Sequence, residues 1–135
     1  RDKNALFLDT GSPHYVELVE NIDEINVRAK GSLIRNSNRY KKNGVNVNFF
    51  KIIEPDKIKI RTYERGVEDE TLSCGTGAVA SSIAFHFLRL TKFDKLKVET
   101  PGGTLAVEFK FNSGIYKDIY LKGPAEKVFS GKIKW

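Results

Sequence analysis

The chain has one cysteine, two histidines and no methionine among its 135 residues. A single cysteine cannot form an internal disulfide, so an oxidising compartment is not implied and we expect a cytoplasmic location. One cysteine and two histidines also supply too few ligands for a zinc site, and we predict no metal. A chain without methionine cannot begin at its own translation start, so we expect it to be part of a longer protein.

Long apolar runs and clustered positive charge are also missing. No apolar run approaches the roughly 20 residues that span a bilayer, and no signal-peptide pattern opens the chain. The net charge of +6 comes from scattered lysines, several of them at alternate positions of strand-like segments. Because no basic-aromatic motif accompanies them, we expect neither a nucleic-acid nor a membrane partner.

The pattern of apolar residues predicts one domain over residues 1–135, with strands on both sides of one long helix. The predicted strands cover residues 5–8, 15–18, 45–53, 57–63, 96–100, 105–111 and 118–122. Asn26 is expected to cap a short helix. The long helix, predicted over 75–90, is apolar almost all round, which is typical of a helix that other elements surround. We therefore predict an α+β fold in which a curved, mostly antiparallel sheet wraps a central apolar helix.

Cys74 is predicted to stand where this long helix begins, in the run Leu72–Ala78 that reads LSCGTGA. The first backbone N–H groups of a helix have no internal partner and, with the macrodipole, can bind an anion. The amides of Gly75 and Thr76 could hold a substrate carboxylate, and the same field favours a thiolate at Cys74. The alternative is that Cys74 is only a small buried residue and the glycines only allow close packing.

Two motifs carry a family resemblance: Arg61–Gly66, which reads RTYERG, and the CGTGA that starts at Cys74. Together they resemble the signature of diaminopimelate epimerases. The likeness extends over essentially the whole chain, as the C-terminal half of such an enzyme, through residues 11–16, 46–49, 101–107 and 123–125. A lone Cys-Gly-Thr-Gly also resembles proline racemases, but the Glu-Arg-Gly and Gly-Ser-Pro-His elements favour the epimerases.

The resemblance implies a role for each matching residue. Cys74 would be one of two acid/base residues on opposite sides of the α-carbon, with His14 in a supporting proton role. Glu64 would bind the ammonium of the reacting centre. The implied catalytic residues are Cys74, His14 and Glu64, and the implied substrate-binding residues are Ser12, Asn46, Glu64, Arg65, Gly75 and Thr76.

Among these, Arg65 and Asn46 would hold the distal end of the amino acid. The amides of Gly75 and Thr76 would hold the carboxylate at its reacting centre. Without the resemblance, the better interpretation would be that Arg65 pairs with Glu64 or with the acidic residues 68–70. Asn46 would then only cap a turn, and Pro13-His14 would only punctuate a strand.

Two departures from the family pattern bear on the site. Ser12 stands where the family usually has asparagine, so one polar contact would be shorter or bridged by water. The loop 67–71 is more acidic than is usual, and its carboxylates would oppose thiolate formation if they approached Cys74.

The expected reaction is cofactor-independent epimerisation of LL- to meso-diaminopimelate, a step in lysine and peptidoglycan precursor biosynthesis. The Schiff-base lysine and phosphate cradle of a pyridoxal phosphate enzyme are not evident, and we expect no cofactor. Inversion then needs an acid and a base on opposite faces of the α-carbon, yet this chain has only Cys74. We expect it to be inactive without an N-terminal half, and we expect exposed apolar surface that allows self-association. The alternatives are another cofactor-independent racemase, such as a proline racemase, and a non-catalytic binding module of the same fold.

Overall fold

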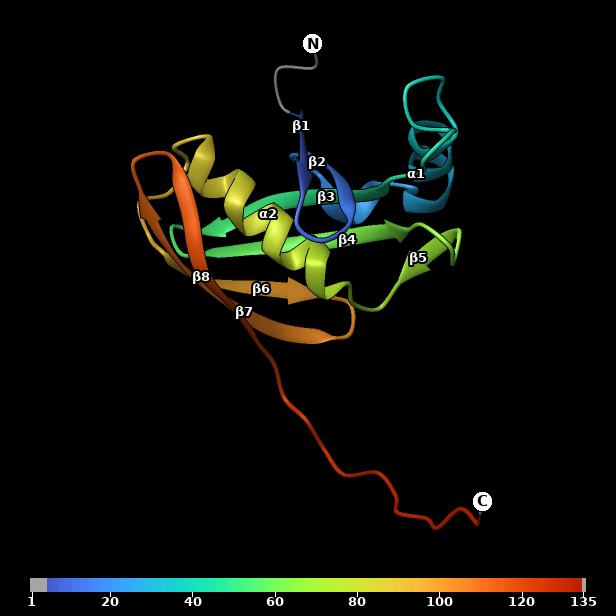
Figure 1. Ribbon diagram of the computed structural model, residues 1–135. Helices are drawn as coiled ribbons and strands as arrows, with labels where there is room; N and C mark the ends of the chain where they lie inside the picture. The colour runs from blue at the N-terminus through green and yellow to red at the C-terminus, as the bar shows by residue number, and fades with distance from the viewer. Residues whose placement is uncertain (1–4, 135) are drawn as a thin grey trace.

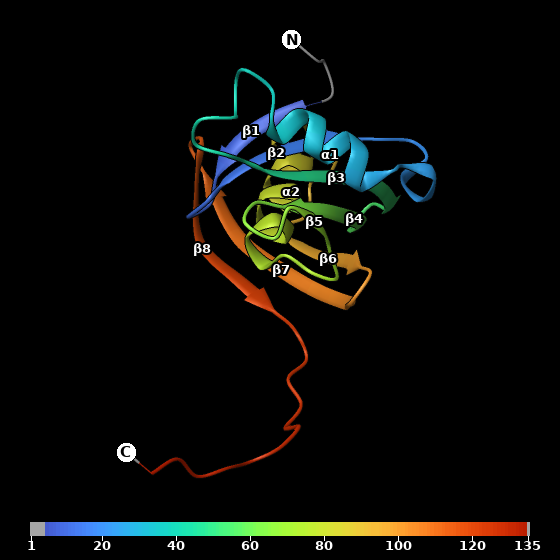
Figure 2. The same cartoon turned by 90° about the vertical axis from the view of Figure 1, so that its right-hand side faces the viewer.

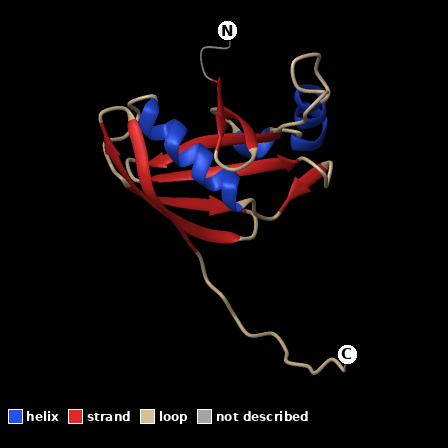
Figure 3. Ribbon diagram, viewed as in Figure 1, coloured by secondary structure: helices blue, strands red, loops and turns tan. Residues whose placement is uncertain are grey.

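A computed structural model describes residues 5–134 of the chain (Figure 1). The elements in chain order are β1 (Ala5–Asp9), β2 (Pro13–Leu18), a 3₁₀ turn η1 (Ile22–Glu24), α1 (Val27–Arg35), β3 (Asn46–Glu54), β4 (Lys57–Glu64), β5 (Asp69–Thr71), α2 (Gly75–Phe87), β6 (Lys95–Thr100), β7 (Gly103–Asn112) and β8 (Ile115–Lys122). Residues 123–134 have no regular secondary structure and lead away from the sheet (Figure 3).

The strands form one curled sheet around α2. Its order is β1-β2-β3-β4-β6-β7-β8, with β5 paired to β4. Most pairs are antiparallel, whereas β2 with β3 and β4 with β6 are parallel. Seen along α2, the sheet curves around the helix like a half-barrel, with α1 outside it (Figure 2). The predicted α+β fold, with a curved and mostly antiparallel sheet around a central helix, is confirmed.

The concave face of the sheet and α2 enclose the main core. Ala78, Ala80, Ala84 and Phe85 of α2 are fully buried, which confirms that the sheet wraps this side of the helix. They pack against the inward side chains of the sheet, which are Val16, Phe50, Ile58, Ile60, Leu96, Val98, Val107 and Phe109. Since three of these four buried residues are alanines, the helix backbone can approach the sheet closely.

The convex face is covered by α1 near β3 and β4. The predicted cap is confirmed, since the Asn26 side chain accepts a hydrogen bond from the amide of Ala29 at 3.0 Å. Val47 and Phe49 of β3 belong to this second core, whereas Phe50 faces α2. Because β3 is buried on both sides, its first five residues are all buried.

The long helix ends three residues earlier than predicted. Its last residue is Phe87, and Arg89 adopts a left-handed conformation with φ 58°. The amide of Leu90 bonds to the Phe85 carbonyl at 3.2 Å, and the amide of Arg89 to that of His86 at 2.9 Å. This is a Schellman motif without its usual glycine, and for that reason the sequence did not signal it.

Two further differences concern strands. β5 was not predicted, because Asp69–Thr71 has no alternation of apolar and polar residues and forms by pairing with β4. β8 begins at Ile115, earlier than expected, and its register against β7 shifts between Glu108 and Lys110, with Asp118 at φ 50°. Neither helix within residues 5–134 is long and apolar enough to cross a membrane.

Gly31 of α1 lies directly on Tyr63 of β4, which yields a first prediction. A Cβ at Gly31 would overlap the Cβ of Tyr63 and would lie 2.6 Å from its Cγ. Alanine is the better helix former by about 1 kcal/mol, but overpacking a core costs roughly 1–3 kcal/mol. Gly31→Ala should therefore lower the free energy of unfolding in urea titrations. Leu33→Ala, at an exposed position of the same helix, is the control and should change it little; a more stable Gly31→Ala chain would contradict this packing.

Candidate active site

Cys74 is the N-cap residue of α2, with extended backbone angles of φ −130° and ψ 108°. Its carbonyl accepts the first helical hydrogen bond from Ala78 at 2.9 Å, and its side chain is buried. The preceding segment is tied to the β6–β7 turn, because the amide of Gly102 donates to the Leu72 carbonyl at 2.7 Å. The start of the helix is thus fixed from both sides, and the position of the sulfur with it.

Gly77 allows the helix start to approach the sheet. A Cβ at this position would overlap Oδ1 of Asn48 and would lie 3.2 Å from the sulfur of Cys74. A larger residue would push α2 away from β3 or turn the Cys74 side chain. The second glycine of the Cys-Gly-Thr-Gly motif is therefore required by packing at the site itself.

Burial raises the pKa of the Cys74 thiol above its ordinary value. The Thr76 hydroxyl, whose oxygen lies 3.7 Å from the sulfur, and the nearby amide of Gly77 oppose the shift, and the charge of Glu64 adds to it. The helix start acts in the predicted direction, because the amides of Thr76 and Gly77 lower the pKa of Cys74, but burial outweighs them and the net shift is upward. The field of a few amides does not offset removal of the sulfur from water.

His14 on β2 is completely buried and held at both ring nitrogens. Nδ1 lies 3.0 Å from Nδ2 of Asn48, and Nε2 lies 3.0 Å from the Ser12 hydroxyl. Burial lowers the pKa of His14 to about 4; the charge of Asp9 acts in the opposite direction, and that of Arg65 lowers it further. His14 is therefore a neutral imidazole at physiological pH.

The Ser12 hydroxyl joins three parts of the site. It lies 3.0 Å from His14 Nε2 and 3.2 Å from the Thr76 hydroxyl, and the Asn46 amide donates to it at 3.4 Å. A second contact between the same segments runs from the Thr10 hydroxyl to the Thr76 carbonyl at 3.1 Å. The β1–β2 loop is thereby attached to the first turn of α2.

Glu64 is the last residue of β4 and Arg65 follows it, beside this cluster. One oxygen of Glu64 accepts from the Thr71 hydroxyl at 2.8 Å. The amide of Arg65 donates to Asn46 at 2.9 Å, and its guanidinium donates to the carbonyl of Asn43 at 2.9 Å. Arg65 is therefore oriented by the segment before β3, and the Asn46 side chain accepts from the first residue of the turn that follows β4.

The acidic residues of loop 67–71 lie against basic side chains near α1. Arg61 donates two hydrogen bonds to Glu70, at 2.7 and 2.8 Å. Glu68 accepts from Arg35 of α1 at 3.2 Å. The additional negative charge of this loop is thus paired on the convex side of the sheet.

The structure brings all the predicted site residues to one end of the sheet around the start of α2: Ser12, His14, Asn46, Glu64, Arg65, Cys74, Gly75 and Thr76. Sequence reasoning missed Asn48 and Thr62. Asn48 contacts the ring of His14, and the Thr62 hydroxyl donates to Asn48 at 2.9 Å. The available signal was the spacing of Asn46 and Asn48, two polar residues on one face of an otherwise apolar strand. Among residues 5–134, no group of three or more His, Cys, Asp or Glu side chains could hold a metal ion.

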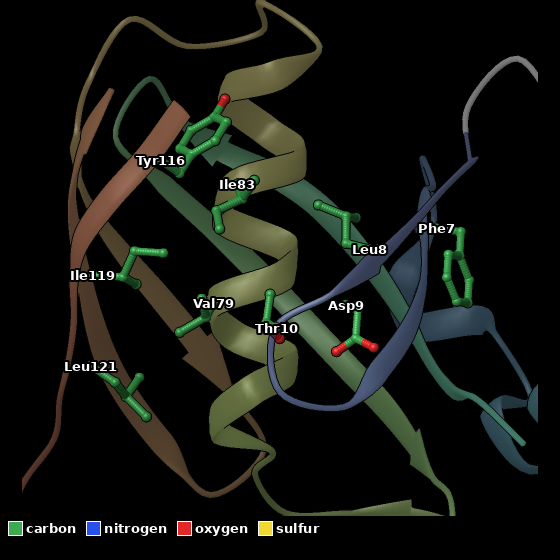
Figure 4. Close-up of a pocket in the computed structure, with 9 residues that line it drawn as sticks. All are labelled: Phe7, Leu8, Asp9, Thr10, Val79, Ile83, Tyr116, Ile119 and Leu121. Carbon is green, nitrogen blue, oxygen red and sulfur yellow. The ribbon is translucent and has the colours of Figure 1, made fainter. Parts of the chain in front are cut away.

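A separate groove of about 650 Å³ runs along α2 between β1 and β8 (Figure 4). Its lining is mostly apolar and consists of Phe7, Leu8, Asp9, Thr10, Val79, Ile83, Tyr116, Ile119 and Leu121. Cys74 does not line it. The groove is the gap left between the two edges of the curled sheet.

The buried neutral state of His14 predicts a stability change in acid. The pKa is lowered from 6.5 to about 4, so below pH 6.5 the unfolded chain binds a proton that the folded chain does not. The contribution of His14 to the free energy of unfolding is fully present above pH 6.5. It falls as the pH drops towards 4, by about 3 kcal/mol in total. NMR titration of the imidazole Cε1–H, assigned with a His86→Gln variant, should give a midpoint near 4. A midpoint near 6.5 would contradict the burial of His14.

Comparisons with known proteins agree with this arrangement. The family model described as diaminopimelate epimerase matches residues 6–128. The diaminopimelate epimerase of Flavobacterium psychrophilum is 46% identical over 130 residues, which are 96% of this chain and 51% of that protein. Those of Chlorobaculum tepidum and Aquifex aeolicus are 45% and 42% identical, again over 96% of this chain and over 50% and 46% of their own lengths. The chain thus spans about half the length of these relatives.

Solved structures show the same fold at lower identity. A phenazine biosynthesis protein of the PhzF family from Enterococcus faecalis is 20% identical, with a TM-score of 0.55 over 73% of this chain and 34% of its own. The Bacillus anthracis protein of that family is also 20% identical, with a TM-score of 0.52 over 82% of this chain and 35% of its own. These two matches establish the fold alone, whereas the family model and the sequence relatives establish more: this chain belongs to the diaminopimelate epimerase family.

Proposed function

We propose that this chain supplies the Cys74 half of a cofactor-independent epimerase that converts LL-diaminopimelate to meso-diaminopimelate. The observation that carries the proposal is the position of Cys74 at the N-cap of α2, beside Glu64 and Thr76. An anion-binding helix start next to an ionisable sulfur is suited to an amino-acid α-carbon. Membership of the diaminopimelate epimerase family supports diaminopimelate as the substrate of this site.

In the proposed step Cys74 starts as the proton donor. Its raised pKa keeps the thiol protonated at neutral pH. A base on the opposite face removes the α-proton, and the electron pair of the C–H bond stays on carbon. The carbanion then takes the Cys74 proton, the S–H bond breaks, and a thiolate remains. In the reverse direction this thiolate is the base, so each turnover exchanges the roles of the two groups.

The groups around the sulfur would hold the reacting centre. The amides of Gly75 and Thr76 belong to the first turn of α2 and favour a carboxylate there. Glu64 offers a negative charge to the α-ammonium, and Thr71 holds one of its oxygens. With both charges of the amino acid paired, removal of the α-proton from a site shielded from water becomes less unfavourable.

Arg65 and Asn46 would hold the distal amino-acid end. The Arg65 side chain packs on Gly44, because a Cβ added at Gly44 would lie 2.5 Å from the Arg65 Cδ. The Asn43 carbonyl holds one end of the guanidinium at 2.9 Å. A guanidinium oriented in this way can bind a second carboxylate through its remaining N–H groups. A charged clamp of this kind suits diaminopimelate, which has a charged distal end. Proline has no distal charged group for such a clamp to bind.

The opposing acid/base group would come from outside this chain. Cys74 is its one cysteine, and the relatives are about twice as long as the stretch they share with it. We propose that the remaining half of a full-length protein presents the second group. The isolated chain would then bind an amino acid without inverting it.

The proposal predicts activity only when the second half is supplied. A chimaera that carries this chain in place of the matching segment of the Flavobacterium psychrophilum relative should incorporate solvent deuterium at the α-carbon of diaminopimelate, measured by NMR. The 135-residue chain alone should not. In the chimaera, Cys74→Ala should lower kcat by roughly 10²–10⁴-fold, the usual contribution of one acid/base group.

Ser73→Ala, an exposed neighbour of Cys74, is the matched control and should leave kcat unchanged. A folded chimaera whose turnover survives Cys74→Ala would overturn the acid/base role. A folded chimaera that exchanges L-proline instead would favour a proline racemase, and one that exchanges neither amino acid would favour a binding module.

A further inference from the structure

A continuous line of hydrogen bonds joins the buried side of β4 to the sulfur of Cys74, and its direction can be assigned from its inner end. The Thr62 hydroxyl donates to Oδ1 of Asn48 at 2.9 Å. The other end of the same amide, Nδ2, lies 3.1 Å from the Tyr15 carbonyl and 3.0 Å from Nδ1 of His14. A carbonyl only accepts, so the group that faces it must be the NH₂ of the amide.

The orientation of Asn48 decides the tautomer of His14. Since the amide nitrogen donates to Nδ1, this ring nitrogen is the acceptor and the proton of the neutral ring lies on Nε2. The Nε2–H group then donates to the Ser12 hydroxyl at 3.0 Å. A second proton on His14 would set Nδ1–H against the NH₂ of Asn48, which agrees with the low pKa of this buried ring.

Ser12 continues the line of hydrogen bonds to Thr76 of α2 in the same donor-to-acceptor direction. Its hydroxyl oxygen also receives a hydrogen bond from Nδ2 of Asn46 at 3.4 Å. The orientation of Asn46 is fixed in turn, because its Nδ2 donates to the Pro13 carbonyl at 3.3 Å and its Oδ1 accepts from the amide of Arg65 at 2.9 Å. With both lone pairs of Ser12 in use, its single hydrogen is left for the remaining neighbour, the Thr76 oxygen at 3.2 Å.

Thr76 is the last member. Its oxygen accepts from Ser12, so its own hydrogen is free to point at the Cys74 sulfur, 3.7 Å away. We propose that Ser12 and Thr76 are positioning residues for the epimerase: together with His14 they form a chain of donors, all directed at Cys74, that stabilises its thiolate. We call the sequence Thr62, Asn48, His14, Ser12, Thr76 the donor chain.

The donor chain changes the part that His14 plays. A neutral imidazole held by Asn48 does not take up a proton during turnover; it fixes the direction of the Ser12 hydroxyl. The inner members of the donor chain are buried, whereas Thr76 at its outer end is exposed. Hydrogen bonds in series strengthen one another, so a Thr76 hydroxyl that accepts from Ser12 is the stronger donor to the thiolate of Cys74. The catalytic purpose of this arrangement rests on the proposed function, but the hydrogen bonds themselves can be tested in the 135-residue chain without any turnover.

The test is the pH profile of Cys74 alkylation by iodoacetamide, because only the thiolate reacts. Thr76→Val removes the terminal hydroxyl and should raise the apparent pKa, which lowers the rate at neutral pH roughly tenfold, as expected for loss of a hydrogen bond to a charged group. Thr76→Ser keeps the hydroxyl and should restore the profile. Ser12→Ala should lower the rate by a smaller factor, roughly threefold, because Thr76 loses its directing donor. Ser12→Thr should recover it.

Ser73→Ala removes an exposed hydroxyl beside Cys74 that is outside the donor chain, and its profile should match that of the unaltered chain. Circular dichroism would show that each variant is folded. If Thr76→Val alkylates with the profile of Thr76→Ser, the donor chain does not act on the sulfur and the inference is overturned.

The tautomer of His14 gives a second, independent readout. In ¹⁵N NMR at pH 7, His14 should carry its proton on Nε2, and Ser12→Ala should shift the Nε2 resonance while Ser73→Ala leaves it unchanged. A proton on Nδ1 would reverse the direction of the chain and overturn the inference. Inactivity of the chimaera would refute the proposed function and would leave both of these measurements intact.

Discussion

The site depends on the contact between Gly77 of α2 and the Asn48 side chain of β3. This contact fixes how closely the helix approaches the sheet, and therefore where Cys74 stands relative to His14. Asn48 can occupy the space because Gly77 has no side chain, and it stays there because Thr62 holds its other end. A polar side chain without these partners would be costly at a position that is completely buried. Helix position and side-chain orientation are thus set by one pair of residues.

Water is kept from both ionisable groups by the same packing. Burial moves the pKa of Cys74 up and that of His14 down, so each rests in its neutral form. Neither group therefore places an unpaired charge in the interior. The side chains of Glu64 and Arg65 lie at the rim of the cluster, half-buried and exposed respectively.

The sequence was sufficient to predict the elements that depend only on neighbouring residues along the chain. The Asn26 cap, the apolar α2 and the alternation in β4 follow from spacing along the chain. The early end of α2 was missed because Arg89 adopts a conformation for which glycine is the usual signal. In the site, the motif located Cys74, but the direction of its pKa shift depends on how deeply the folded chain buries it. The role of Asn48 likewise depends on partners 33 and 34 residues away in the chain.

The two edges of the curled sheet differ in how they would meet another strand. Within residues 5–134, β1 and β8 end the strand order and each presents backbone groups that no neighbouring strand bonds. β8 is irregular, with its shift of register and the left-handed Asp118; Lys117 precedes Asp118 and Lys122 ends the strand. Such a kinked and charged edge resists the addition of a strand. β1 pairs with β2 in regular register along its five residues, with no break. If this domain aggregates or exchanges segments with a copy of itself, the ordered edge at β1 is where extension of the sheet would begin.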